Sequence, residues 1–528
     1  MKLMKVSLLL TTLVLTSCFN NGGTHHPSNS TSDDSTNTLT PSRTSATTTS
    51  TIPIGDDEVL VNFTAINDFH GQIDESDDMV GLAKMATYIK DRKTQGDILI
   101  SSGDVYQGSF LCNYDKGHFL TNQFKELGFD AMTLGNHEFD WGVQSILNNE
   151  AVFGEPFLGA NIYKYPKTTS EWEKADLGQE YKIVTVNEGT DNEVKVGIIG
   201  VIGKDQITSI TSTFTEDYIF LDPVPIVKTL SVELHDTYNC DIVVVSAHMG
   251  EMYASLSENV PGKDYRYVDA CFLAHTHQFE YGISNDVPFI QAGAYGQGVS
   301  SASLVFNKTT KKVRTQTSNY IYLADPKLNL KEDTQTKTRI QNEKNKNADK
   351  YNNIIGVNST GRAISTGNMS RFYAKLTYDK ALIEAPTYDI KGVMFNYSRR
   401  SLKAGNFTYA DLFETHPFLN EIYIFSISKK DFENEKSMSY GYIDPDFVQD
   451  DKYHDVVVFN YTGFHIGVDS NYNKYYNYYP SAFTSNAEHP PVKLSFNCFE
   501  AALEWLDIHH SITTAQYNGS GFFGGYGY

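Results

Sequence analysis

The segment "TLGNHEFDWG", residues 133–142, places Asn136, His137, Glu138 and Asp140 within five positions. The residues before it, "ELGFDAM", are typical of a helix end that runs into a short apolar strand. The polar cluster therefore begins where a strand ends, which is where ligands collect in open α/β sheets. One such cluster is more often a surface turn than a site, so the other strand ends of the chain decide what it means.

Apolar runs alternate with helical patterns from residue 59 to about residue 325. The helical patterns cover residues 79–96 and 118–128. The apolar runs are typical of strands buried on both faces of a sheet, and the fold class that we predict is α/β or α+β, with helices outside the sheet. The strand-like runs cover residues 59–68, 97–104, 194–203, 241–250, 270–278 and 287–296.

Polar side chains follow four of these strands and the short strand before residue 136. Because the ends of neighbouring strands lie side by side, we expect the groups to converge on one edge of the sheet. In extended backbone, positions i and i+2 point the same way, so each D-x-H or H-x-H pair can address one site. The groups are Asp68 with His70, Asp104, the 136–140 cluster, His248, and His275 with His277.

Carboxylates, an amide oxygen and imidazoles together suit zinc, manganese or iron(II) better than calcium. Seven such ligands are more than one tetrahedral ion needs. They indicate two divalent ions, roughly 3.5–4 Å apart and bridged by one carboxylate.

The order D-x-H, G-D, G-N-H-E, H-x-G and A-H-x-H resembles that of the calcineurin-like metallophosphoesterases. The spellings "NDFHGQ", "GDVYQGS", "GNHEFDWG" and "AHTHQ" are similar to those of the bacterial 5′-nucleotidase and UDP-sugar hydrolase family, from about residue 58 to the C-terminus. The resemblance implies a four-layer β-sandwich flanked by helices, a linking helix, and a smaller mixed α/β domain that binds the substrate.

The resemblance also implies roles for individual residues. Asp68, His70 and His277 match the ligands of the first metal, and Asp104 matches the bridging carboxylate. His137 and Asp140 match the catalytic pair. The ligands of the second metal match Asn136, His248 and His275. One departure is Ala274, where a glycine is usual, and its methyl group should not displace the ligands.

These roles define the expected chemistry. Metals lower the pKa of bound water, so a hydroxide forms near neutral pH and attacks phosphorus. His137, oriented by Asp140, stabilises or protonates the departing oxygen. For Glu138 we expect a structural hydrogen bond.

In the family the C-terminal domain holds the base and sugar. "HPFLNE" resembles its P-F-x-N, which makes Phe418 one stacking face and Asn420 a base contact. "YNGSGFF" resembles a drifted F-N-x-x-G-G-D, which puts Tyr517 on the other face. Arg362 and Arg399 match arginines that bind phosphate or carboxylate oxygens. This sequence departs from the family in two places. "FNYS" replaces a glycine-rich run, and the position of the closing acidic residue falls near Phe523, where the acidic residue is missing.

The N-terminus is typical of a bacterial lipoprotein. Residues 1–17 have two lysines, an apolar run and small residues, as in a signal peptide. They end in a lipobox-like "LTSC", where Cys18 would be acylated; a chance cysteine after an ordinary signal is the alternative. Residues 18–57 are rich in Ser, Thr and Asn and suit a disordered tether. We expect the body to be anchored by lipid on the outer face of the cell membrane.

The folded body divides by composition into a metallophosphoesterase domain at 58–326, a charged connecting helix at 327–351, and a domain at 352–528. The net charge of −21 argues against binding to nucleic-acid polymers. We expect the remaining cysteines to be buried thiols, although the sequence alone does not exclude a disulfide. These are Cys112, Cys240, Cys271 and Cys498.

Three functions compete. The leading one is an extracytoplasmic 5′-nucleotidase with two metals. The same metals would serve a 2′,3′-cyclic phosphodiesterase or a nucleotide-sugar pyrophosphohydrolase. A surface lipoprotein that binds without catalysis is the third, and the complete ligand set argues against it. Metal identity, preferred substrate and oligomeric state stay open.

Overall fold

The computed structural model describes residues 47–49, 52–165, 172–250, 254–428, 432, 439–445, 453–464, 466–476 and 490–524. Arg43–Tyr528 form one compact unit. The predicted signal peptide, Cys18 and most of the predicted tether lie outside the described residues.

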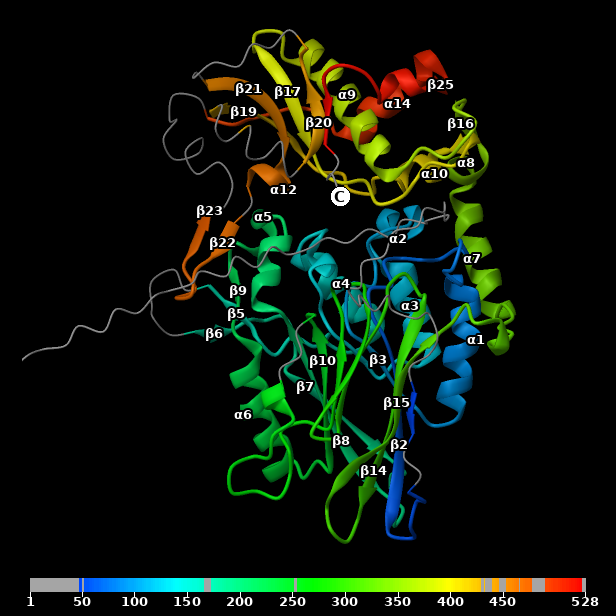
Figure 1. The fold of residues 1–528 in the computed structure, drawn as a ribbon, viewed down its shortest axis with the longest axis vertical. Coiled ribbons are helices and arrows are strands. Elements are labelled where there is room, and N and C mark those ends of the chain that lie inside the picture. The colour runs from blue at the N-terminus through cyan, green and yellow to red at the C-terminus, as the bar shows by residue number, and fades with distance from the viewer. Residues whose placement is uncertain are drawn as a thin grey trace, which may run out of the picture. The chain divides into compact units, whose positions relative to one another are not determined.

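Two six-stranded sheets form the first half of this unit (Figure 1). In the first sheet β2 pairs in parallel with β3, and β3 in parallel with β4. Its strands, in spatial order, are β1 (Thr47–Thr49), β15 (Val313–Tyr322), β14 (Gly298–Asn307), β2 (Glu58–Ile66), β3 (Ile98–Ser101) and β4 (Ala131–Met132).

The second sheet has a parallel centre, in which β10 lies between β8 and β11, and β11 pairs with β13. The four strands of this centre are apolar runs of the sequence and fall where the sequence predicts them, whereas the two edge strands were not predicted. The sheet, in spatial order, has β12 (Phe279–Ser284), β13 (Val287–Ala292), β11 (Ala270–Leu273), β10 (Ile242–His248), β8 (Val194–Ile202) and β7 (Tyr181–Val186).

β1 departs from the sequence prediction. Thr47–Thr49 pair antiparallel with residues 317–319 of β15, inside the segment assigned to a disordered tether. Threonine is β-branched and suits a strand, and the edge of β15 offers unpaired backbone groups. The tether prediction is therefore wrong for these three residues.

The two sheets pack face to face. Val61 and Phe63 of β2 belong to the same buried cluster as Ile198 of β8 and Phe272 of β11. The Phe63 and Phe272 ring centroids are 5.9 Å apart. Since each sheet is covered by the other on one face and by helices on the other, its central strands need apolar side chains throughout.

Helices complete the four layers. α1 (Gly81–Thr94), α3 (His118–Leu127) and α4 (Val143–Phe153) share a buried cluster with residues of the first sheet. α6 (Pro223–Asp236) packs against the second sheet through Val227 and Leu230. The predicted four-layer sandwich is confirmed.

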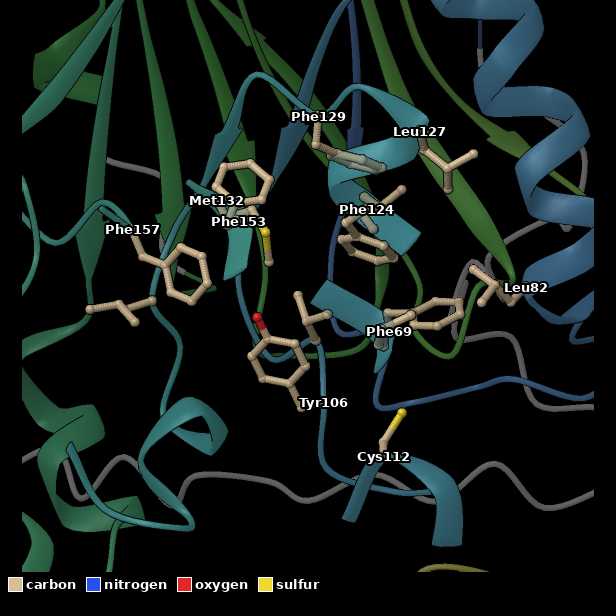
Figure 2. Close-up of a cluster of buried hydrophobic side chains, with 14 of the residues drawn as sticks. Phe69, Leu82, Tyr106, Cys112, Phe124, Leu127, Phe129, Met132, Phe153 and Phe157 are labelled. Atoms are coloured by element: carbon tan, nitrogen blue, oxygen red, sulfur yellow. The ribbon is translucent and has the colours of Figure 1, made fainter. Parts of the chain in front are cut away.

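Figure 2 shows the cluster between the first sheet and its helices. The Phe124 and Phe129 rings stack with centroids 4.6 Å apart, and Phe69 lies 5.8 Å from Phe124. Phe69 is 1% exposed and stands between two predicted ligands, Asp68 and His70. It therefore anchors their loop in the core.

The predicted connecting helix is divided. α7 (Thr334–Lys346) is capped by Asp333, whose carboxylate accepts the Thr336 N–H, and α8 (Ala348–Asn352) follows after a break at Asn347. Lys344 on α7 contacts Asp74 at 2.5 Å, so the linker is tied to the first half of the chain.

A second mixed α/β region follows. α9 (Thr366–Glu384) packs against α14 (Cys498–His509) and against β17 and β20 of a third six-stranded sheet. That sheet, in spatial order, has β24 (Val492–Lys493), β19 (Ile422–Ser428), β21 (Tyr453–Phe459), β17 (Ile390–Phe395), β20 (Tyr440–Ile443) and β26 (Phe522–Phe523).

The buried clusters mostly follow the predicted division, but Phe110 and Tyr472 pack across it. Phe110 of the first region belongs to the main cluster of the second, and its ring contacts Tyr409 and Phe413 at 5.5 and 5.6 Å. The chain does not separate into two units at this division, and the exact domain bounds stay predictions.

Two further properties concern the whole described chain. Cys112, Cys240, Cys271 and Cys498 are buried free thiols, which settles the question left open by the sequence. Within the described ranges, no helix combines the length and apolar composition that crossing a membrane requires.

We expect Phe63→Ala to lower the free energy of unfolding by about 3–5 kcal/mol, because it leaves a cavity between the sheets. Urea unfolding monitored by circular dichroism measures this change. The matched control is Leu60→Ala on the same strand, where the side chain is 36% exposed and the change should stay within about 0.5 kcal/mol. Equal losses for both variants would mean that the sheets do not meet at Phe63.

Candidate metal centre

The predicted ligands come from both sheets. Asp68 and His70 follow β2, Asp104 follows β3, and Asn136 follows β4, all in the first sheet. The three remaining histidines follow or end strands of the second sheet: His248 ends β10, and His275 and His277 follow β11. The expectation of a single sheet edge is therefore wrong, because an apolar period does not say which sheet a strand joins.

The ligand loops have an unusual backbone. Five ligands adopt positive φ, a region that usually costs a non-glycine residue about 1–3 kcal/mol and is found at functional sites. The D-x-H and H-x-H pairs are therefore not extended, as the sequence analysis assumed. The φ angles are 46° for Asp68, 47° for His70, 54° for Asp104, 78° for His275 and 59° for His277.

Backbone hydrogen bonds hold the first two loops in this conformation. The Asp68 N–H donates to Gly103 O at 3.0 Å, and the His70 N–H donates to Asp104 O at 3.0 Å. The turn after β2 is thus braced against the turn after β3, so their side chains are placed together.

The first group consists of Asp68, His70 and His277, with ligand atoms within 4.8 Å of one another. His277 Nε2 lies 3.4 Å from Asp68 Oδ1 and 3.1 Å from His70 Nε2. His70 Nδ1 faces Gln107 O at 3.1 Å and donates to it, which leaves Nε2 for a cation. A divalent ion fits this set of donors.

The second group consists of Asp104, His248 and His275. His248 Nδ1 donates to Ser102 O at 2.9 Å, so its Nε2 faces Asp104 Oδ2 at 3.3 Å. Asn136 Oδ1 lies 3.1 Å from both His248 Nε2 and His275 Nδ1. Two imidazoles, a carboxylate and an amide oxygen therefore converge, as the sequence predicts.

Asp104 lies between the groups, since its Oδ2 is also 3.9 Å from His70 Nε2. Burial would raise the pKa of Asp104, but His248 and His137 hold it well below its usual range. Burial lowers the pKa of His248, but Asp104 raises it to about 9. A cation that binds here therefore displaces a proton, and two divalent metal ions that share Asp104 fit the charge of the site.

His137 stands beside the two groups. Its Nδ1 donates to Asp140 Oδ2 at 2.8 Å, and its Nε2 accepts from Arg399 Nη2 at 2.8 Å. Its backbone N–H donates to Asp104 Oδ1 at 2.8 Å. Burial lowers the pKa of His137, but Asp140 and Asp104 together raise it above its ordinary value. Nε2 is therefore the ring atom that can exchange a proton.

Glu138 has the structural role that its place in the motif suggests. Its carboxylate accepts three backbone N–H groups, from Asp104 at 2.9 Å, Val105 at 2.7 Å and Gly135 at 2.6 Å. Gly135 must be a glycine, because a Cβ there would lie 2.3 Å from Asp104 Oδ1. Ala274, the departure from the family pattern, is fully buried and leaves both following histidines in the centre.

The predicted substrate residues are placed unequally. The Arg399 guanidinium lies 5.2 Å from the Phe418 ring centroid, and the Phe418 ring lies 6.2 Å from His137. Tyr517 is 4% exposed within the hydrophobic core of the second region. No ring contact joins it to Phe418 anywhere in the described chain. A base held between two rings would keep them apart, so the predicted stacking of a base between Phe418 and Tyr517 stays a prediction.

The other substrate predictions lie apart from these contacts. Arg362 is exposed and Asn420 is half-buried. Phe523, near which the family's closing acidic residue would fall, is not a predicted substrate residue and pairs with Gly441 in the third sheet. Sequence analysis missed Arg400, which contacts Gln72 and forms an ion pair with Glu414 at 3.2 Å. Its only signal was the doubled arginine in "NYSRR".

Comparison with known proteins agrees with this geometry. Residues 61–279 match the model of the calcineurin-like phosphoesterase family. The chain is 28% identical over 294 residues to an apyrase of Tabanus yao, covering 49% of this chain and 50% of that protein. It is 28% identical to a 5′-nucleotidase of Diplobatis ommata, over 46% of this chain and 45% of the relative. The chain thus spans about half the length of these curated relatives.

The similarity to known proteins extends to the fold of most of the chain. A 5′-nucleotidase precursor from Thermus thermophilus superposes with a TM-score of 0.63 at 17% identity, covering 86% of this chain and 97% of that one. Together with the paired Asp and His groups, these findings identify the first half of the molecule. Residues 61–279 match the calcineurin-like phosphoesterase family, and about half of the chain is similar in sequence to a 5′-nucleotidase.

Proposed function

We propose that this protein is a two-metal phosphohydrolase that releases phosphate from nucleotides in the manner of a 5′-nucleotidase. The observation that carries the proposal is the pair of metal groups meeting at Asp104, with His137 beside them. Named 5′-nucleotidases among both the relatives and the solved structures support the choice of substrate.

The chain's own residues divide the work. Two divalent metal ions, when bound, act as Lewis acids on the phosphoryl oxygens and lower the pKa of water. Asp140 fixes the ring of His137, so that Nε2 faces the reacting group and holds the proton for the departing oxygen. Arg399, from the second region, donates to the same Nε2 atom in this structure. When a substrate binds, the guanidinium can donate to the phosphate oxygens instead of to His137.

Other substrates would use the same machinery. A 2′,3′-cyclic phosphodiesterase or a nucleotide-sugar pyrophosphohydrolase needs these metals and a different leaving-group site. A panel of AMP, ADP, UDP-glucose and 2′,3′-cyclic AMP separates the three activities. A binding lipoprotein without catalysis would release phosphate from none of them, and the complete set of ligands argues against it.

We also propose that the protein is exported and anchored through Cys18. The support is the sequence of residues 1–18, with its lysines, apolar run and lipobox-like ending. Mass spectrometry of the N-terminal peptide from the membrane fraction should find a lipid on Cys18. An unmodified Cys18 in the mature protein would contradict the anchor.

Metal binding and proton transfer can be separated by two variants. His137→Ala should keep two bound ions and lower kcat by roughly 10²–10⁴, because it removes a positioned acid. Asp104→Ala should lose ions as well as activity, because both groups share its carboxylate. Metal analysis and steady-state kinetics on AMP measure these outcomes. If His137→Ala lost both ions, His137 would be a ligand and the proposed division of roles would fail.

The base site can be tested at Phe418. Stacking of a base on an aromatic ring contributes about 1–3 kcal/mol, so Phe418→Ala should reduce kcat/KM for AMP by about ten- to a hundredfold. The reaction of p-nitrophenyl phosphate, which has no base, should barely change. Leu419→Ala, at a neighbouring side chain that is 58% exposed, is the control variant. An equal loss on both substrates would mean that Phe418 acts by holding Arg399.

A further inference from the structure

Asn67, the residue before the first ligand, joins the two sheets. It is 5% exposed, and its Nδ2 donates to Asp68 Oδ2 at 2.8 Å and to Gly293 O at 2.6 Å. Its Oδ1 accepts the Ala292 N–H at 3.1 Å. Asn67 follows β2 of the first sheet, and Ala292 ends β13 of the second. The carboxamide therefore fixes one ligand carboxylate relative to the opposite sheet.

The turn after β13 makes three more contacts with the same metal group. The Tyr295 N–H donates to Asp68 O at 2.7 Å. The Tyr295 ring centroid lies 5.2 Å from that of His70 and 5.5 Å from that of His277. Asn67 and Tyr295 together therefore touch all three members of the first group.

The second group is held by other residues. The Asp104 N–H donates to the Glu138 carboxylate at 2.9 Å, and His248 Nδ1 donates to Ser102 O. Neither a hydrogen bond from the Asn67 side chain nor a ring contact of Tyr295 reaches this group in the described ranges. The two groups are joined instead through backbone hydrogen bonds: the His275 N–H donates to Asp68 Oδ2 at 2.9 Å, and the His70 N–H donates to Asp104 O at 3.0 Å.

We propose that Asn67 and Tyr295 are positioning residues for the first metal group, and that they set its affinity independently of the second group. The inference rests on the proposed function only in that Asp68, His70 and His277 bind a metal. Asn67 fixes the rotation of the Asp68 carboxylate, and the Tyr295 ring limits the tilt of both imidazoles. Partners of this kind typically change metal affinity about 10- to 100-fold when removed.

The test is a titration of the metal-free full chain with Mn²⁺ by calorimetry, together with a count of bound ions after dialysis at fixed free Mn²⁺. Asn67→Ala should weaken one of two binding steps by about 10- to 100-fold and leave the other unchanged. Electron paramagnetic resonance should then show isolated Mn²⁺ where the wild type shows a coupled pair.

The identity of the weakened site follows from a double variant. His277→Ala, which removes a ligand of the first group, should show the same single remaining step. Asn67→Ala added to His277→Ala should weaken that step no further. If the double variant weakened the remaining site as well, Asn67 would act on the whole centre and the proposal would be wrong.

Asn161 provides the matched control. It is fully buried, its Nδ2 donates to Ile202 O at 2.6 Å and Leu221 O at 2.7 Å, and its Oδ1 accepts the Ile202 N–H at 3.0 Å. The pattern is that of Asn67, but every partner is backbone. Asn161→Ala should lower the melting temperature and leave the Mn²⁺ affinity of the first metal group unchanged. If Asn161→Ala weakened Mn²⁺ binding to the first metal group as much as Asn67→Ala does, Asn67 would be a general stabilising residue and the proposal would be wrong.

Tyr295 keeps the proposal testable if Asn67→Ala does not fold. Tyr295→Ala should weaken the same binding step, and Tyr295→Phe, which keeps the ring, should restore it. Wild-type binding in Tyr295→Ala would overturn the role of the ring. Failure of the wild-type chain to bind two ions would instead count against the proposed function, so the two failures can be told apart.

Discussion

The metal centre depends on hydrogen bonds that join the two sheets at one edge. The apolar interface between the sheets is stabilising but non-directional, so by itself it does not fix how far one sheet slides over the other. Near the ligands, buried hydroxyl groups form directed links: Thr133 Oγ1 donates to Ser246 Oγ at 2.7 Å, and Ser246 Oγ donates to Ser102 Oγ at 3.1 Å. Leaving such a group unpaired costs about 1–3 kcal/mol, which penalises any other register.

This constraint connects the parts of the site. Asp68, from the first sheet, accepts the backbone N–H of His275, from the second. His248, from the second sheet, donates to Ser102 O of the first. One ligand of each sheet is therefore oriented by the backbone of the other. The strained left-handed loops persist because these bonds leave them no relaxed alternative.

The local pattern of the sequence predicted most of the sheet strands and the ligand clusters, because several apolar runs end directly in a group of polar residues. It did not predict that Asp104 and His248 belong to different sheets, because a local apolar pattern does not indicate which distant strands pair with one another. The positive φ of His70 was also hidden, because nothing in "NDFHG" other than its glycine signals such a backbone. The burial of Tyr517 in the core of the second region depends on packing around a drifted motif, which the motif itself does not show.

The buried thiols have a consequence for handling the protein. Cys112, Cys240, Cys271 and Cys498 are dispersed through both halves of the molecule, and none is bonded to another. Burial raises the pKa of the Cys240 thiol to about 11 and those of the other three beyond the usual range of thiols. The reactive thiolate form is thus suppressed at each of them. The described fold therefore has no disulfide that an oxidising compartment would stabilise, and a reducing agent leaves its covalent framework unchanged.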